Sequence, residues 1–506
     1  MKKILALLIA MLMLLSAASV LAEGTLVYGS GDYTRINPAI DEHGEINLLI
    51  FNGLTAHDAD NNVVPCLAES WDYDEATHTY TFHLAQNVKF HDGEPFTAGD
   101  VKFTIEAIMD PANESEIASN YTDVKEIRVV DDNTVEFELE GNNAAFLEYM
   151  TIGILPRHLL EGEDMQTSDY FRFPIGTGPY KLERWDEGQA ITLVKNENYF
   201  LGAPNIDKVV FKIVEDDNVK ALQLKSGELN MAQVTPKDAQ LFENDAQYAI
   251  YRMKTSDYRG ILFNFWNPYW QENKDIIPAI NYAIDREAMI QAVLLGQGDV
   301  AYGPLQRNIY NNPDVEHYDY NPEKAIEILE SVGCERGEDG FFYRNGEKIA
   351  FPINCRAGDQ VRIDLAQIAS QQLKAVGIDM TVEIPASVDW GTQYAFLIGW
   401  GSPFDADDHT FKVFGTDQGN NYSGYSNADV DAALLAARST FDSEERAKAY
   451  ADFQVALAND PAYTFFCYID ADYVVDARVK GITPDTVLGH HGVGIFWNVA
   501  EWTIDG

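Results

Sequence analysis

The sequence predicts a mixed α/β protein with at least two lobes, and three observations support this prediction. The chain has 506 residues, which is too long for a single ordinary hydrophobic core. Its hydrophobic content of 46% and aromatic content of 12% are typical of a folded, globular chain. Strand-like and helix-like patterns alternate along it, and no segment repeats with a period of roughly 20 to 50 residues.

Individual strands and helices follow from the spacing of apolar residues. Strands are predicted where apolar and polar residues alternate, in TYTFHL (79–84), TVEFELE (134–140), AITLVKN (190–196) and KVVFKIV (208–214). Helices are predicted where apolar residues recur every three to four positions, at 98–109, 276–296, 321–333 and 427–441. The helix at 321–333 also has its end signals, because Asn321 caps it, Pro322 opens it and Gly333 closes it.

The first 22 residues have the pattern of an export signal. Lys2 and Lys3 precede an apolar run from Ile4 to Leu15, and small residues lead to Ala22 as the cleavage point. No cysteine follows that could carry a lipid anchor, and no later segment is apolar enough to cross a membrane. We therefore expect the mature chain to work outside the cytoplasm, in the periplasm or at the outer face of the cell membrane.

The charge and the missing motifs exclude several classes of function. The chain carries 80 acidic and 36 basic residues, a net charge of −44 that repels nucleic acids and anionic lipids. It contains no GxxxxGK[ST], GxSxG or HExxH motif. We therefore expect neither an enzyme nor a cofactor.

The four cysteines, Cys66, Cys334, Cys355 and Cys467, show no spacing typical of a metal site. Between Cys334 and Cys355 lie two strand-like runs around Asn345-Gly346, a favourable two-residue hairpin turn. Folding this hairpin would bring the two cysteines together, which predicts a Cys334–Cys355 disulfide. Two buried free thiols are the alternative.

A long segment in the first half of the chain carries a family resemblance. The string NNVVPCLAESWDYDEATHTYTFHLAQNVKFHDGEPFTAGDVKFTIEAI (61–108) resembles the signature region of family 5 of the extracytoplasmic solute-binding proteins, the peptide and nickel class. Further similar segments follow in family order at 174–200, 222–232, 278–305, 321–333 and 365–380. The resemblance covers nearly the whole mature chain, and it implies that His91, Asp92 and Gly93 form a structural turn before a helix.

The resemblance implies a fold and a function. The fold would be a two-lobed, type II periplasmic-binding-protein fold of the large class, with two hinge crossings. Lobe I would span 23–264 with an extra subdomain at about 60–190, lobe II would span 265–481, and 482–506 would return to lobe I. The function would be capture of short peptides by lobe closure, by a monomer that serves the permease and ATPase subunits of an ABC importer. The alternatives are a nickel or metal-chelate binding protein of the same class and, less favoured, a secreted hydrolase.

The resemblance also places candidate ligand contacts in GWGSPFDADDHTF (399–411). Trp400 matches a pocket tryptophan of nickel-type members, and Phe404 lies beside it. Asp405 matches an aspartate of the same pattern, and with Asp407 it could pair with an ammonium group or a metal. The alternatives are core packing for Trp400 and a solvated, helix-capping loop for the acidic residues.

Four further candidates lie outside this stretch. Arg362 falls near an arginine that receives the peptide carboxylate in dipeptide-binding relatives, and a guanidinium suits that role. Tyr121 could supply a second aromatic face to the ligand, although a position in the core or on the surface is the simpler interpretation. Tyr33 is a candidate because it lies on a polar loop after the first strand. His43 is a surface histidine or, with His409, one half of a two-histidine metal site that closure assembles. The arginines with which nickel-type members hold a chelate are missing from 117–123 and 146–156, which argues against that alternative.

Overall fold

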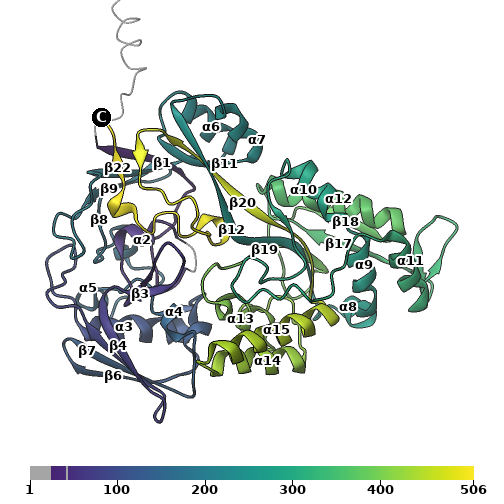
Figure 1. Cartoon of the computed structure of the whole chain (residues 1–506), viewed down its shortest axis with the longest axis horizontal. Helices are drawn as coiled ribbons and strands as arrows, with labels where there is room; N and C mark the ends of the chain where they lie inside the picture. Colours follow the sequence, from purple (N-terminus) through teal and green to yellow (C-terminus); the bar gives the residue numbers. More distant parts are fainter. Residues whose placement is uncertain (1–23, 42–43) are drawn as a thin grey trace, which may run out of the picture.

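The chain folds into two lobes that share one continuous sheet (Figure 1). The structure is a computed structural model that describes residues 24–41 and 44–506. The expected export signal, residues 1–22, lies outside the described residues, as does His43. No helix in the described part of the chain is long and apolar enough to cross a membrane.

The shared sheet has eleven strands in the order β18-β17-β19-β12-β20-β11-β1-β10-β9-β8, with β13 pairing to β20. Strands β1 and β17 pair in parallel with both of their neighbours, and the other pairs are antiparallel. The bounds are β1 Thr25–Ser30, β8 Tyr180–Asp186, β9 Ala190–Lys195, β10 Lys208–Ile213, β11 Met231–Val234, β12 Tyr248–Phe263, β13 Asp299–Val300, β17 Ala350–Asn354, β18 Asp379–Glu383, β19 Ala395–Trp400 and β20 Tyr463–Asp476. Strands β9 and β10 confirm the predictions for 190–196 and 208–214.

Two long strands, β12 and β20, carry the chain between the lobes. They pair along most of their length, with a shift of register between Lys254 and Tyr258. The hydrophobic core changes at the same level, because Met253 packs in the core of lobe I and Tyr258 in that of lobe II. We propose that the crossings lie at 254–257 and 469–470, earlier than the boundaries at 264 and 481 that the resemblance implies.

In lobe I the sheet is covered on both faces. Val27 of β1 packs under helices α6 (Asp217–Lys225) and α7 (Pro236–Ala239), whereas its neighbours Leu26 and Tyr28 point to the opposite, larger core. This alternation is what the period of two along a strand produces.

An extra subdomain of lobe I forms a separate four-stranded antiparallel sheet in the order β4-β5-β7-β6. Its elements are β4 Ala68–Asp74, β5 Thr79–Leu84, β6 Val124–Asp131, β7 Thr134–Leu139, α3 Ala98–Met109, α4 Phe146–Tyr149 and α5 Arg157–Leu160. Strands β5 and β7 and helix α3 confirm the predictions for 79–84, 134–140 and 98–109. Helix α3 starts where Asp100 accepts hydrogen bonds from the Thr97 amide and hydroxyl, at 2.9 and 2.8 Å.

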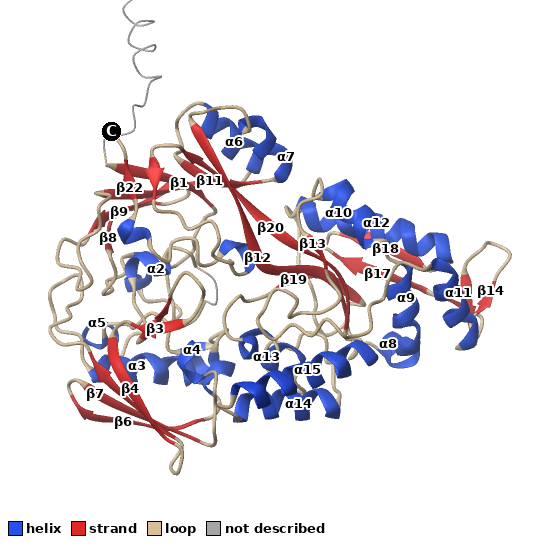
Figure 2. Cartoon of the chain, viewed as in Figure 1, coloured by secondary structure: helices blue, strands red, loops and turns tan. Residues whose placement is uncertain are grey.

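Lobe II is a three-layer α/β sandwich (Figure 2). Along β19, Ala395 and Leu397 face one helical layer and Phe396 and Ile398 face the other. The first layer holds α8 Pro268–Asn273, α9 Ile277–Ala283, α10 Arg286–Val293, α11 Pro322–Ser331 and α12 Gln360–Val376. The second layer holds α13 Phe411–Phe414, α14 Ala428–Ser439 and α15 Ser443–Asn459. Helices α11 and α14 confirm the predictions for 321–333 and 427–441.

The single helix predicted at 276–296 is wrong, because the chain breaks there into α9 and α10. Ile284 adopts an extended backbone with ψ of 115°, and the Asp285 carboxylate caps α10 by accepting a hydrogen bond from the Ala288 amide at 3.0 Å. An aspartate favours a cap over a helix interior because its short side chain competes for backbone donors.

The predicted Cys334–Cys355 disulfide does not form, since all four cysteines are free and buried. The hairpin itself is confirmed: Asn345 and Gly346 have φ of 54° and 82° between β15 (Phe342–Arg344) and β16 (Glu347–Lys348). However, β17 then leaves the hairpin and joins the shared sheet between β18 and β19. Its five residues carry Cys355 about 17 Å away along the strand.

Candidate functional site

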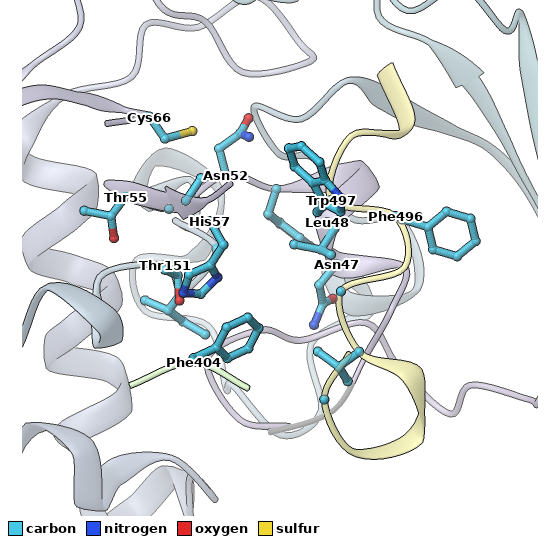
Figure 3. Close-up of a pocket in the computed structure, with 18 of the residues that line it drawn as sticks. Asn47, Leu48, Asn52, Thr55, His57, Cys66, Thr151, Phe404, Phe496 and Trp497 are labelled. Atoms are coloured by element: carbon cyan, nitrogen blue, oxygen red, sulfur yellow. The ribbon is translucent and has the colours of Figure 1, made fainter. Parts of the chain in front are cut away.

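A cavity of about 710 Å³ lies between the two lobes (Figure 3). Lobe I supplies most of the lining, mainly from residues 44–66, 117–121, 148–153, 199–205 and 489–501. Lobe II contributes residues 401–412, which include most of the stretch GWGSPFDADDHTF. The predicted ligand region therefore does face the cleft, although only some of its side chains reach the cavity.

Aromatic rings from opposite lobes meet in the cavity. Phe404 of lobe II stacks on His57 of lobe I, with ring centroids 3.9 Å apart and planes within 5°. Phe404 is one of the predicted ligand contacts, and the structure places it in the lining. His57 in turn pairs with Glu148, 2.5 Å from Nε2 to Oε1, so its orientation is fixed. Leu48 and Trp497 belong to the same lining (Figure 3).

Asp405 lies outside the cavity lining and is already paired. Its carboxylate accepts hydrogen bonds from Nη1 and Nη2 of Arg446, both at 2.6 Å, and one from the Asp407 amide at 2.9 Å. That last bond caps the short 3₁₀ helix η6 (Ala406–His409). The structure therefore gives Asp405 the helix-capping role that the sequence left open as the alternative to ammonium or metal binding.

Asp407 is also outside the lining, and it joins the two lobes. Arg438 donates to it from Nε at 3.0 Å and from Nη2 at 2.5 Å, and the Tyr149 hydroxyl of lobe I donates to the same carboxylate. The Ala144 amide of lobe I donates to the Arg438 carbonyl at 2.8 Å. We call Tyr149, Asp407 and Arg438 the clasp. It holds the subdomain of lobe I against lobe II, so the cleft is closed at this end.

Asp408, His409 and Lys412 line the cavity from lobe II. Asp408 Oδ2 lies 3.0 Å from His409 Nδ1, and Oδ1 lies 3.2 Å from Lys412 Nζ. Burial alone would raise the pKa of Asp408, but Lys412 and His409 hold it well below its usual range. The carboxylate is therefore ionised, and it fixes the orientation of the imidazole.

Trp400 and Arg362 lie behind the cavity, outside its lining. Trp400 ends β19, and its ring centroid lies 5.5 Å from that of His409 and 6.3 Å from that of His490. Next to it, a Cβ at position 399 would overlap the Arg259 guanidinium and lie 2.7 Å from Arg362 Nη2. Gly399 is therefore required by two arginines that cross the strand here.

Arg362 is buried and pairs with another residue of the protein, so it does not face a ligand. It lies in the first turn of α12, where its Nε is 2.9 Å from Oδ2 of the capping residue Asp359. Burial, together with the nearby charge of Arg259, lowers the pKa of Arg362 to about 10. The carboxylate-binding role expected for Arg362 has no support from this position, because the side chain does not reach the cavity.

Of the remaining candidates, Tyr121 lines the cavity and Tyr33 does not. The Tyr121 side chain is 1% exposed, and its hydroxyl donates to the Tyr149 carbonyl at 2.6 Å. Tyr33 packs edge-on against Phe211 with ring centroids 6.4 Å apart. His43 lies outside the described residues, so its pairing with His409 stays a prediction.

Sequence reasoning missed His57, Glu148 and His490 in the lining. His490 Nδ1 lies 2.9 Å from Asp257 Oδ1, and the rings of His490 and His491 are 3.8 Å apart. The two adjacent histidines lie in a 3₁₀ turn, η7 (His490–Gly492), where His491 has φ of 56°. Asp257, His490 and His491 thereby offer ligand atoms within 4.8 Å of one another, a geometry that could hold a metal ion. The adjacent histidine pair was the available signal.

His91 takes the structural position that the resemblance implied. Its Nδ1 accepts from the Gly176 amide at 3.2 Å, and its Nε2 lies 3.0 Å from the Gly178 carbonyl. Burial lowers the pKa of His91 to about 4, so the ring is neutral at physiological pH. The imidazole thus joins the turn before α3 to residues 176–178.

Comparisons with known proteins agree with this architecture. The family model for bacterial extracellular solute-binding proteins, family 5 (middle region) matches residues 62–422. Protein XP55 of Streptomyces lividans is 32% identical over 91% of this chain and 86% of its own length. The oligopeptide-binding protein AppA of Bacillus subtilis is 30% identical over 95% of this chain and 91% of its own length.

Two solved structures are similar over almost the whole fold. NikZ of Campylobacter jejuni in complex with Ni(L-His) is 37% identical, with a TM-score of 0.90, and the match covers 96% of this chain and all of the other. AppA of Bacillus subtilis in complex with a nonapeptide is 28% identical, with a TM-score of 0.86, over 96% of this chain and 99% of the other. The chain therefore belongs to family 5 of the bacterial extracellular solute-binding proteins.

Proposed function

We propose that this protein is the exported, monomeric substrate-binding component of an ABC importer and that it captures short peptides by closing two lobes over them. The observation that carries the proposal is the cavity of about 710 Å³ between lobes joined by the clasp. Cavities of roughly 300–1,000 Å³ enclose drug-sized ligands, which corresponds to a peptide of about two or three residues. Relatives named as oligopeptide-binding and dipeptide-binding proteins support the same substrate class.

The lining suits peptides because it combines apolar rings with a few polar groups. Phe404, Tyr121 and Trp497 offer apolar faces at low cost in rotamer entropy. Lys412 is the one lysine or arginine among the described lining residues, so it is the candidate partner for a peptide carboxylate. A hydrolase is disfavoured because Asp405 and Asp407, its candidate carboxylates, are each engaged by an arginine. After closure the complex would deliver its ligand to the permease and ATPase subunits.

Thermal shift with peptides of increasing length tests the proposal. A ligand that is present at about 100-fold excess over its Kd adds about 2.7 kcal/mol to the free energy of unfolding. We expect di- and tripeptides at about 100 μM to raise Tm, whereas hexapeptides exceed the cavity and should raise it little. Free amino acids serve as the control for nonspecific stabilisation. If no peptide of any length raises Tm, peptide capture is contradicted.

A second candidate, a metal–histidine chelate, is favoured by one specific observation. Three histidines, His57, His409 and His490, line the cavity, and imidazole nitrogens are good ligands for Ni(II). The similarity to NikZ in complex with Ni(L-His) points the same way. Calorimetry with Ni(II) alone, with histidine alone and with the Ni(II)–histidine complex separates the two candidates. Heat with only the third titrant supports the chelate, and no heat with any titrant removes it.

A further inference from the structure

One part of the cavity is walled by lobe I alone. We call it the arm, and its lining consists of Leu48, Asn52, Cys66, Tyr199, Leu201 and Trp497. In Figure 3, Cys66 of the arm and Phe404 of lobe II lie on opposite sides of the cavity. Lobe II therefore meets the cavity away from the arm.

The walls of the arm are bonded to one another. Asn52 Nδ2 donates to the Tyr199 hydroxyl at 3.1 Å. Asn205 Nδ2 donates to the carbonyls of Ala500 and Glu501, at 3.4 and 3.2 Å. These bonds join the three segments of lobe I that form the arm, so its shape does not depend on closure. A preformed site saves a ligand the entropic cost of ordering it.

The polar groups of the arm are already engaged by the protein. Asn52 Oδ1 accepts a hydrogen bond from the Thr177 hydroxyl at 3.3 Å, and Trp497 Nε1 donates to the Thr483 hydroxyl at 2.9 Å. Burial raises the pKa of the Cys66 thiol to about 12, so this thiol is neutral at physiological pH. The arm therefore offers a ligand aromatic rings and aliphatic groups.

Two leucines of the arm leave apolar surface uncovered. Leu48 is 40% exposed and Leu201 is 63% exposed, and both line the cavity. Leu201 begins an exposed stretch with Gly202 and Ala203, where the arm opens to solvent. Scattered exposed leucines are ordinary on protein surfaces, but apolar side chains that gather in a concave site are typical of ligand binding.

Charged side chains belong to the part of the cavity that lobe II closes. Asp408 comes from lobe II, and Glu148 pairs with His57, on which Phe404 stacks. Glu501, near the mouth of the arm, is exposed to water. A charged or amide side chain in the arm would lose its hydration without gaining a partner, whereas an apolar side chain gains by leaving water.

We infer that the arm is a subsite for one apolar side chain of the bound peptide, aliphatic or aromatic, and that the protein selects peptides by this side chain. The inference rests on the proposed function, since it names which peptides the cavity prefers. Because the arm is complete within lobe I, the open protein already holds this subsite.

Isosteric pairs of tripeptides test the inference on the wild-type protein. Leucine and asparagine have nearly the same shape, so each pair consists of alanine tripeptides that carry one or the other at the first, second or third position. Protein freed of ligand by refolding is incubated with an equal excess of both members of a pair. Bound peptide is then released and quantified by liquid chromatography with mass spectrometry. We expect a leucine preference of about tenfold or more at one position and of less than about threefold at the other two.

Two variants locate the effect. Leu48→Asn and Leu201→Asn should each lower the leucine preference about threefold or more, because each places an amide in the wall of the arm. Leu222→Asn is the matched control, because Leu222 is 68% exposed on α6 and lies outside the cavity lining. It should keep the wild-type preference. The preference is a ratio within one sample, so a partial loss of folded protein does not change it.

The outcomes separate this inference from the proposed function. Equal binding of leucine and asparagine peptides at every position overturns the inference and leaves peptide capture standing. The same holds for an equal leucine preference at all three positions, or for a wild-type preference in both arm variants. If no tripeptide binds, peptide capture itself fails, and the inference fails with it.

Discussion

Replacing Tyr149 with phenylalanine removes one hydroxyl group from the clasp and leaves the core of each lobe unchanged. The hydroxyl donates to Asp407 across the cleft, so this bond exists only while the lobes are closed. Asp407 keeps both of its hydrogen bonds from Arg438 within lobe II. The variant therefore weakens the closed state and spares the open one.

The expected magnitude follows from the kind of bond that is lost. A hydrogen bond to a charged group contributes about 1.5–3 kcal/mol, and the lower end applies because Asp407 stays paired. A loss of about 1.5 kcal/mol in the closed state lowers the ratio of closed to open protein about tenfold. The apparent affinity falls by the same factor where closure is needed for tight binding and the open form predominates without ligand.

Equilibrium dialysis with an equimolar library of tripeptides measures this change. Tyr343→Phe is the matched control, since its hydroxyl donates to Asp339 at 2.9 Å on the surface of lobe II and joins no lobes. We expect Tyr149→Phe to raise the Kd about tenfold and Tyr343→Phe to leave it unchanged. Equal affinities for Tyr149→Phe and the wild type would refute the role of the clasp in closure.

Three further substitutions probe stability. Asp405→Ala leaves Arg446 as an unpaired buried cation and should lower the free energy of unfolding by about 3–5 kcal/mol in urea titration; a loss below about 1 kcal/mol would contradict the buried pair. Gly399→Ala forces a methyl group against Arg259 and should cost about 1–3 kcal/mol in the same assay, whereas an unchanged midpoint would show that the arginines move freely. Burial raises the pKa of Glu45 from 4.5 to about 7, so this carboxyl group ionises at a lower pH in the unfolded chain than in the folded protein. The free energy of unfolding of the wild type therefore falls as the pH rises from 4.5 to 7. Glu45→Gln lacks this loss, and its stability advantage should grow between pH 4.5 and pH 7; an advantage that is flat with pH would exclude the raised pKa.

The sequence predicted those elements whose pattern is local. The runs at 79–84 and 134–140 are half-buried strands, so the alternation of apolar and polar residues marks their bounds. Asn345-Gly346 forms the predicted hairpin turn because both residues readily adopt the positive φ that this turn requires. The break between α9 and α10 was missed because apolar residues keep the helical period across it, and only the Asp285 cap interrupts the helix.

The site was harder to predict because its partners are far apart in the sequence. Asp407 pairs with Arg438, 31 residues away, and with Tyr149, 258 residues away, so an acidic loop that looked like a ligand site is bound to the protein itself. Cys355 is separated from Cys334 because β17 pairs with β18 and β19 in the shared sheet and not with the hairpin strands. The local spacing of residues does not indicate this pairing. Phe404 and His409 reach the cavity lining because their segment follows β19 directly, and their contact with a ligand stays a prediction.

Competition in a single tube tests the central claim most directly. Protein freed of ligand is mixed with the tripeptide library and Ni(II)–histidine at equal concentrations, and native mass spectrometry identifies the bound species by its mass. Peptide capture predicts one tripeptide per chain and no bound Ni(II)–histidine. A chain that carries Ni(II)–histidine in place of peptide, or no ligand at all, would contradict it.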